Sequence, residues 1–298
     1  MTLAPAKTNV ANSSISSDTL TSLHAPSLSL CHVIRAYITR NTINADTLTE
    51  QQRLNHFPVA AVCIVTWYLQ GQAEIVQVGD TKCKQALPCP IVFSGPRSEP
   101  VTTSNPGPVD IFILVLSPET LHLLTDIDVA FHNNRSSAFS AVFDTEWQAM
   151  AQAVLHAANH EQRIELLEDF FERKWQSHAP RRHLSMHLFT DLIQGMAVQM
   201  LASKWLRSVR QIERQIKSLS GMSFQRQHVL RRAERRFITT RDMVLNSKKS
   251  WADIAAETGY ADQAHLCRET RKSTGLSPEE LKIRIMNDES YWLYRIWL

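Results

Sequence analysis

The feature that most constrains this chain is a short motif that occurs twice, with an offset of 54 residues between the copies. In each copy an apolar residue is followed by an arginine two positions later, a glycine nine positions later and a serine eleven positions later. The matching pairs are Ile212 and Leu266, Arg214 and Arg268, Gly221 and Gly275, and Ser223 and Ser277. Four matches at one offset indicate two copies of the same structural unit.

The second copy, in residues 251–278, has the signals of two short helices joined by a tight turn. Ser250 and Asp253 form a capping-box pattern ahead of a short apolar-faced helix. Gly259 can adopt the positive φ that a sharp turn requires. Asp262 can cap a second helix, and Gly275 can end it. This order of elements predicts a helix-turn-helix.

The second predicted helix has one apolar face and one basic face. Leu266 and Thr270 are four residues apart and therefore share one side of the helix. Ala264, Arg268 and Arg271 fall roughly opposite. A small residue beside two guanidinium groups suits a helix in a DNA major groove. The alternative is an ordinary surface helix with solvated charges.

The first copy repeats the basic face and is joined to the second by a long apolar-patterned segment. Arg210, Arg214 and Lys217 lie opposite Ile212 on its predicted helix. Residues 224–246 contain no Gly or Pro, which predicts one continuous helix. At about 1.5 Å per residue this helix would span roughly 34 Å, close to one turn of B-DNA. It could therefore hold two DNA-reading helices in successive major grooves.

This arrangement resembles the C-terminal domain of the AraC/XylS family of transcription regulators over residues 185–284. The resemblance is carried by Ile-Ala-x4-Gly-Tyr-x-Asp-Gln in the second copy and by the Gly-Leu-Ser-Pro that follows it. With the helical faces, it implies double-stranded DNA as a partner, with a small-molecule effector, a second copy of the chain and RNA polymerase as further candidates. The expected base-reading residues are Arg210, Glu213, Arg214, Gln263, His265 and Arg268, and the expected phosphate contacts are Arg231, Arg232, Lys248 and Lys249.

The charge is distributed as such a protein requires. The chain of 298 residues has a formal net charge of only +3. Residues 185–298, however, hold 19 basic against 12 acidic residues, and the segment from Lys204 to Lys249 holds 13 against 3. A basic C-terminal half is typical of a nucleic-acid-binding region.

The five cysteines and the hydropathy pattern indicate a compartment. The cysteines are odd in number and widely spaced, which favours reduced thiols. The longest apolar stretches, residues 59–69 and 111–116, are well short of the roughly 18 residues that span a bilayer. We expect a soluble cytoplasmic protein without membrane contact.

The N-terminal half predicts a different fold class. Residues 1–27 are expected to be a disordered tail, with a short helix over residues 16–23 as the alternative. Between residues 28 and 118 short β-branched runs alternate with Pro and Gly, which predicts a small barrel or sandwich. The expected strands lie at residues 31–34, 59–69, 74–78, 91–93 and 109–116, with a turn over residues 93–100. This region resembles weakly the cupin-like sensor domains of many AraC/XylS members.

The remaining segments complete an α+β chain, in which a β-rich cupin-like domain precedes an all-α bipartite helix-turn-helix domain. Residues 119–184 are expected to be a helical connector, whose apolar stripes could form a dimer seam or cover the barrel. It would end in a linker near residues 177–182. The aromatic extension at residues 285–298 is expected to pack on the DNA-binding domain or on another chain.

Enzyme-like constellations are few. The pairs His156 with His160, and His183 with His187, are spaced for one helix face but have no evident third metal ligand. Cys31 and Cys63 could be nucleophiles, although buried strand cysteines are commoner. The predicted function is a sequence-specific transcription regulator without catalytic residues, metal or cofactor. The alternatives are a cupin-type enzyme fused to a DNA-binding domain, and a constitutive DNA binder with a structural β domain.

Overall fold

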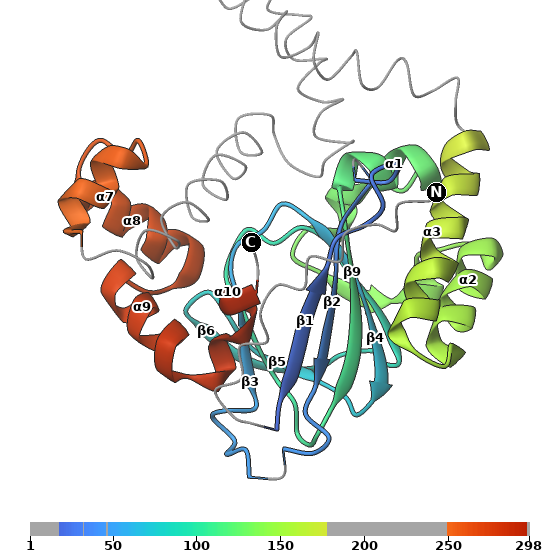
Figure 1. Cartoon of the computed structure of the whole chain (residues 1–298), viewed down its shortest axis with the longest axis horizontal. Helices are drawn as coiled ribbons and strands as arrows, with labels where there is room; N and C mark the ends of the chain where they lie inside the picture. The colour runs from blue at the N-terminus through green and yellow to red at the C-terminus, as the bar shows by residue number, and fades with distance from the viewer. Residues whose placement is uncertain (1–17, 32, 46, 178–248, 297–298) are drawn as a thin grey trace, which may run out of the picture.

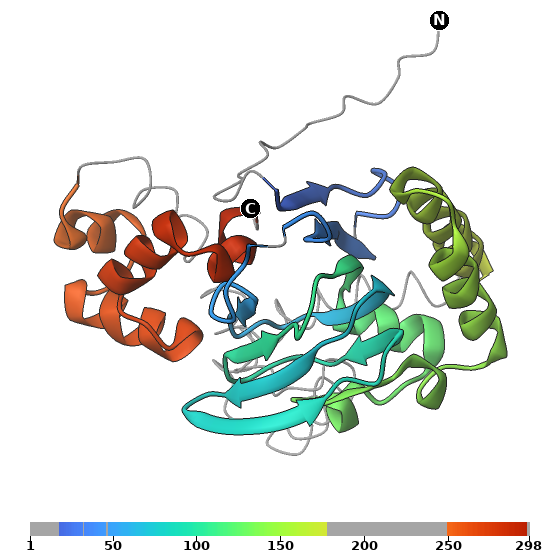
Figure 2. The ribbon, with the colours of Figure 1, turned by 90° about the horizontal axis from the view of Figure 1, so that it is seen from below.

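The computed structural model of the chain describes residues 18–31, 33–45, 47–177 and 249–296. Strands occupy the middle of the described molecule, with helices α1 to α3 on one side and α7 to α10 on the other (Figures 1 and 2). This confirms the expected fold class of a β-rich N-terminal region followed by C-terminal helices. Among the described residues no helix is long and apolar enough to cross a membrane.

The strands form two antiparallel sheets. The six-stranded sheet has the order β1-β2-β9-β4-β7-β10, and the four-stranded sheet has the order β3-β8-β5-β6. In the first sheet the strands are Leu20–His24, Ile34–Asn41, Asp110–Leu116, Cys63–Gln70, Ile91–Ser94 and Ser136–Ala138. In the second they are Leu54–Phe57, Val101–Ser104, Glu74–Val78 and Thr81–Ala86.

The central strand β9 shows why the region folds in layers. Successive side chains of a strand point to opposite faces. Phe112 and Leu114 belong to a core cluster shared with the helices, whereas Ile113 and Val115 belong to a second cluster that faces the other sheet. Both faces of β9 are therefore covered, which explains its continuous apolar sequence.

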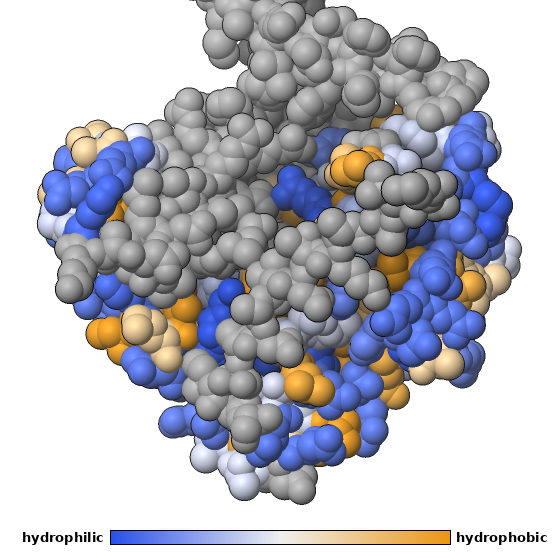
Figure 3. Space-filling view, in the orientation of Figure 1, coloured by the Kyte–Doolittle hydropathy of each residue, from blue (hydrophilic) through white to orange (hydrophobic). Residues whose placement is uncertain are grey.

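The expected helical connector covers the outer face of the six-stranded sheet. Its elements are α1 Pro118–Thr125, α2 Thr145–His156 and α3 His160–Ser177, with short 3-10 turns η1 Val129–His132 and η2 Phe139–Ala141 between them. Leu167, Phe170 and Phe171 of α3 are buried in the core cluster that includes Trp67 of β4. The Trp67 indole donates a hydrogen bond to the carbonyl of Ala151 on α2, at 2.9 Å. The apolar stripes thus face the sheet, while the outer surface of α2 and α3 is mainly hydrophilic (Figure 3).

Two N-terminal expectations are wrong. Residues 20–24 are not part of a tail or a helix, because β1 pairs with β2 along its whole length, from Leu20 opposite Asn41 to His24 opposite Tyr37. The strand expected at residues 31–34 begins only at Ile34, because the amides of Val33 and Ile34 both donate to the carbonyl of Leu30, at 2.8 Å, and form a turn ahead of β2. The expected linker at residues 177–182 lies outside the described residues after Ser177.

The C-terminal helices are α7 Trp251–Glu257, α8 Gln263–Thr274, α9 Pro278–Asn287 and α10 Trp292–Ile296, with the 3-10 turn η3 Glu289–Tyr291 before α10. The aromatic extension does more than pack on these helices. Tyr291 and Tyr294 contact Leu281 and Ile285 of α9, but Trp292 enters the core cluster between the two sheets. The expectation that this segment docks only on the DNA-binding domain, or on another chain, is therefore incomplete.

Candidate DNA-reading helices and the adjoining cavity

The described helix-turn-helix is built as its sequence predicts. Ser250 and Asp253 form a capping box at the start of α7, and Gly259 has a φ of +74° in the turn. The Asp262 carboxylate accepts a hydrogen bond from the amide of His265, at 2.6 Å, and caps α8. Gly275 ends α8 with a φ of +81°, a conformation that favours glycine.

A small core fixes the angle between α7 and α8. Leu266 is fully buried in a cluster with Ile254, Ala255 and Tyr260. Thr270, four residues after Leu266, is buried on the same side of α8. The face assigned from the sequence as core is thus the buried face.

The opposite face of α8 is open to solvent. Gln263, Ala264 and Arg268 are exposed. Arg271 is also exposed, and its guanidinium lies 3.9 Å from the carboxylate of Glu280 at the start of α9. In the described part of the chain no ion pair involves Arg268.

Two predicted contact residues have local partners. The His265 ring packs edge-on against Tyr260, and its Nδ1 accepts a weak bond from the amide of Ala261, at 3.4 Å. The ammonium group of Lys249 lies 2.6 Å from the carboxylate of Glu257. Their predicted DNA contacts would require these interactions to be exchanged. The other predicted contacts, Arg210, Glu213, Arg214, Arg231, Arg232 and Lys248, lie outside the described residues.

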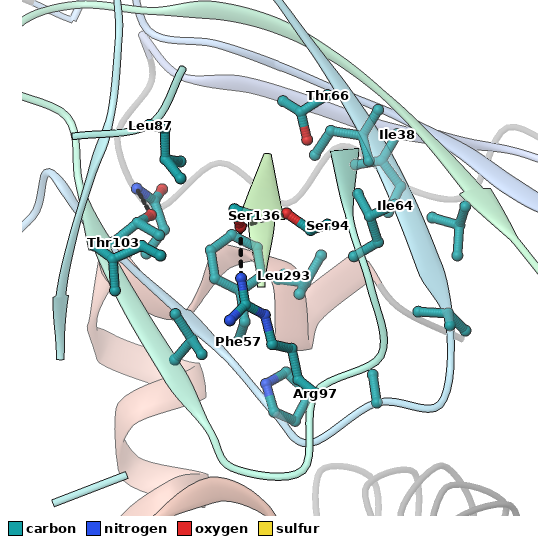
Figure 4. Close-up of a pocket in the computed structure, with 18 of the residues that line it drawn as sticks. Ile38, Phe57, Ile64, Thr66, Leu87, Ser94, Arg97, Thr103, Ser136 and Leu293 are labelled. Atoms are coloured by element: carbon teal, nitrogen blue, oxygen red, sulfur yellow. Dashed lines mark hydrogen bonds between the residues drawn. The ribbon is translucent and has the colours of Figure 1, made fainter. Parts of the chain in front are cut away.

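A cavity that no sequence motif predicts lies between the two sheets (Figure 4). It has a volume of about 150 Å³. The six-stranded sheet contributes Ile38, Ile64 and Tyr68, and the four-stranded sheet contributes Ile75 and Val101. Trp67 and Phe93 lie under the helices on the other face of the six-stranded sheet.

The C-terminal half completes the wall of this cavity. Leu293 and Tyr294 of α10 line it, and so does Ser273 near the end of α8. The carbonyl of Ser273 accepts a hydrogen bond from the amide of Val59, another lining residue, at 2.8 Å. The cavity therefore adjoins the second helix of the helix-turn-helix directly.

A buried polar network joins α10 to the β region. Glu289 lies 3.0 Å from Arg40 on β2 and 3.0 Å from Arg295 on α10, and its side chain is only 1% exposed. The Arg40 guanidinium stacks over the Trp292 ring, 4.7 Å from its centre. The Trp292 indole donates to the side-chain oxygen of Asn55, at 2.8 Å. These contacts fix the position of the C-terminal helices on the β region.

The histidine and cysteine candidates are separated by the fold. His156 ends α2 and His160 begins α3, so the two do not share a helix face as the sequence suggested. Within the described ranges no three potential metal ligands gather, and His183 and His187 lie outside them. Cys63 is buried in β4, where burial raises the pKa of its thiol, whereas Cys31 is exposed in the turn before β2.

Residues 201–284 match the family model described as a helix-turn-helix domain. The chain carries an AraC-type helix-turn-helix domain. The matched range contains both sequence copies of the motif, including the described pair α7 and α8. No curated protein matches the sequence.

Solved structures give distant likenesses to this chain. ToxT from Vibrio cholerae O395 is 10% identical, with 89% of this chain and 97% of that chain covered and a TM-score of 0.36. ToxT from Vibrio cholerae strain SCE256 with a bound unsaturated fatty acid is 9% identical, with 78% and 94% covered and a TM-score of 0.34. The AraC-like transcriptional activator CuxR is 12% identical, with 93% and 91% covered and a TM-score of 0.24. Because these scores are low, the assignment depends on the domain match.

Proposed function

We propose that the protein is a sequence-specific transcription regulator whose DNA affinity responds to a small molecule bound between the two sheets. The AraC-type domain supports DNA binding. The response to a ligand is supported by one observation, namely that α8 and α10 supply part of the cavity wall. A ligand that contacts Ser273 or Leu293 can favour one position of these helices over another.

The proposed reading of DNA follows from the two faces of α8. Arg268 projects from the face opposite the buried Leu266 and can donate two hydrogen bonds to a guanine edge in the major groove. Arg210 and Arg214 would read the next groove in the same way, with Glu213, Gln263 and His265 beside them. Arg231, Arg232, Lys248 and Lys249 would contact phosphates, which carry no sequence information directly. Dimerisation and contact with RNA polymerase stay predictions.

Selection of binding sites from a random DNA pool tests this proposal. The full chain should enrich one motif, and its affinity should fall with salt by a log-log slope of about −0.9 per phosphate contact. Arg268→Ala should cost about 1–3 kcal/mol and relax the preference at a few base positions. Arg214→Ala should do the same about one DNA turn away.

Arg232→Ala is the matched control, because loss of a phosphate contact should weaken all sequences alike. Leu266→Ala is a second control. It should lower the stability of the helix pair by about 2–5 kcal/mol and abolish binding through unfolding, which circular dichroism would detect. The assigned roles would be contradicted if Arg214→Ala and Arg268→Ala both enriched the wild-type motif with the same preference at every base.

A further inference from the structure

The wall of the cavity is mainly apolar. Among the residues that line it, Arg97 alone carries a charge. Asn55 and Asn105 also line it. The Asn55 side-chain amide donates a hydrogen bond to the Asn105 side-chain oxygen at 2.7 Å, and the Asn55 side-chain oxygen accepts a hydrogen bond from the Trp292 indole. Their hydrogen-bonding capacity is thus largely used within the protein. Arg97 is therefore the lining group best placed to recognise a charged ligand.

Arg97 is held in place by its backbone. Its amide donates to the carbonyl of Ala60 at 2.9 Å, and its carbonyl accepts from the amide of Ala60 at 3.3 Å. The preceding turn is tight, because a Cβ at Gly95 would lie 2.2 Å from the carbonyl oxygen of His132. Only glycine fits at that point. These contacts fix the backbone of the loop from which the Arg97 side chain extends.

The guanidinium points towards two hydroxyl groups (Figure 4). Its Nη2 donates to the Ser136 hydroxyl at 2.5 Å, and that hydroxyl is 2.7 Å from the hydroxyl of Ser94. Ser94 and Ser136 are directly opposite each other on the paired strands β7 and β10. A guanidinium and two hydroxyl groups thus converge on one corner of a mainly apolar cavity.

No carboxylate balances this cation within the described ranges, since no ion pair there involves Arg97. Burial lowers the pKa of the Arg97 guanidinium, but arginine stays protonated in proteins. A cation at an apolar wall without a counter-ion is unfavourable, and an anion from outside would supply the missing charge. The planar fork of arginine matches the two oxygens of a carboxylate.

The remaining cavity limits the size of the ligand. An apolar cavity of about 150 Å³ accommodates a molecule the size of benzene. We propose that the cavity binds a compact apolar monocarboxylate, whose carboxylate lies on Arg97, Ser94 and Ser136 and whose apolar body lies between the sheets. This inference rests on the proposed function of the cavity as the ligand site and names the class of ligand.

Calorimetric titration of the full chain with a matched pair of probes tests it. The probes are cyclohexanecarboxylate and cyclohexanecarboxamide, which have nearly the same shape but differ in charge. The wild-type chain should bind the carboxylate at least tenfold more tightly than the amide. Arg97→Met should remove that tenfold preference, because it should weaken binding of the carboxylate far more than binding of the amide.

Two variants serve as controls. Arg135→Met removes a nearby arginine that stacks on the exposed Phe131 ring outside the cavity, and it should change neither affinity. Ile64→Phe fills part of the cavity and should weaken both probes. If Arg97→Met does not fold, Arg97→Lys keeps the charge but loses the fork, and it should give an intermediate affinity for the carboxylate.

The outcomes separate the two proposals. Equal binding of carboxylate and amide by the wild-type chain, or a carboxylate preference that survives loss of Arg97, would overturn the carboxylate assignment and leave the cavity as a ligand site. If neither probe binds, both the carboxylate assignment and the role of the cavity are overturned. Both proposals are supported if the carboxylate preference depends on Arg97 and Ile64→Phe weakens binding of both probes.

Discussion

At the scale of single residues, Glu289 links the C-terminal helices to the β region. Its carboxylate accepts a hydrogen bond from the Thr19 hydroxyl at 3.0 Å and forms ion pairs with Arg40 and Arg295, and all of these groups are buried. Glu289→Gln would remove the carboxylate that two buried guanidinium groups share. Breaking a buried ion pair in this way costs about 3–5 kcal/mol. Urea denaturation of the variant and the wild type would measure the difference.

The exposed pair of Lys249 and Glu257 supplies the control for this prediction. Its side chains are 46% and 40% exposed. Glu257→Gln should therefore cost only about 0.2–1 kcal/mol. If Glu289→Gln were as mild as this control, the buried network would not hold the two halves together.

His56 adds a dependence on pH at the same contact. Its ring stacks on Tyr291 at 4.3 Å and bonds the Thr102 hydroxyl at 3.0 Å. Burial lowers the pKa of His56 to about 4; Asp288 opposes this shift and Arg284 adds to it. The unfolded chain, with a His56 pKa near 6.5, therefore binds the proton more readily than the folded chain.

The stability that depends on His56 is accordingly complete above pH 6.5 and is lost as the pH falls towards 4. The loss at pH 5 should be about 2 kcal/mol. Urea denaturation at pH 7 and pH 5 would compare the wild type with His56→Phe, which keeps a ring but cannot be protonated. The same loss in both proteins would rule out His56 as its source.

At the scale of elements, the sequence predicts those whose signals are local. The β-branched run of β5 predicts its bounds of Glu74–Val78, and the caps of α7 and α8 predict their positions. β6, by contrast, contains two lysines and is exposed along its whole length, so it shows no apolar alternation. Its strand conformation depends on pairing with β5, which the sequence does not reveal.

The candidate site likewise has features that the sequence predicts and features that it does not. The buried and exposed faces of α8 could be predicted, because helical periodicity fixes them. The role of Arg97 could not be predicted, because this residue lies in a loop and its position depends on Ala60 and Ser136. The docking of Trp292 could not be predicted either, since its partner Asn55 is 237 residues away in the chain. A Trp in an aromatic chain end was the one available signal, and it did not identify the surface that receives it.

At the scale of the whole molecule, the cavity and the recognition helix are neighbours. Val59 lines the cavity and bonds the end of α8 through Ser273, while Leu293 and Tyr294 line it from α10. Any ligand that binds one arrangement of these helices more tightly must shift the chain towards that arrangement. A tenfold preference corresponds to about 1.4 kcal/mol of coupling.

The central claim is that ligand in the cavity and DNA on the helices are coupled, and thermodynamic reciprocity tests it most directly. DNA selected from the random pool would be titrated with and without saturating cyclohexanecarboxylate, by fluorescence anisotropy. The carboxylate would be titrated with and without that DNA, by calorimetry. Coupling requires both affinities to change by the same factor. We expect a factor of about 5–150, the usual range for coupled sites. Two binding events that leave each other's affinity unchanged would contradict the account.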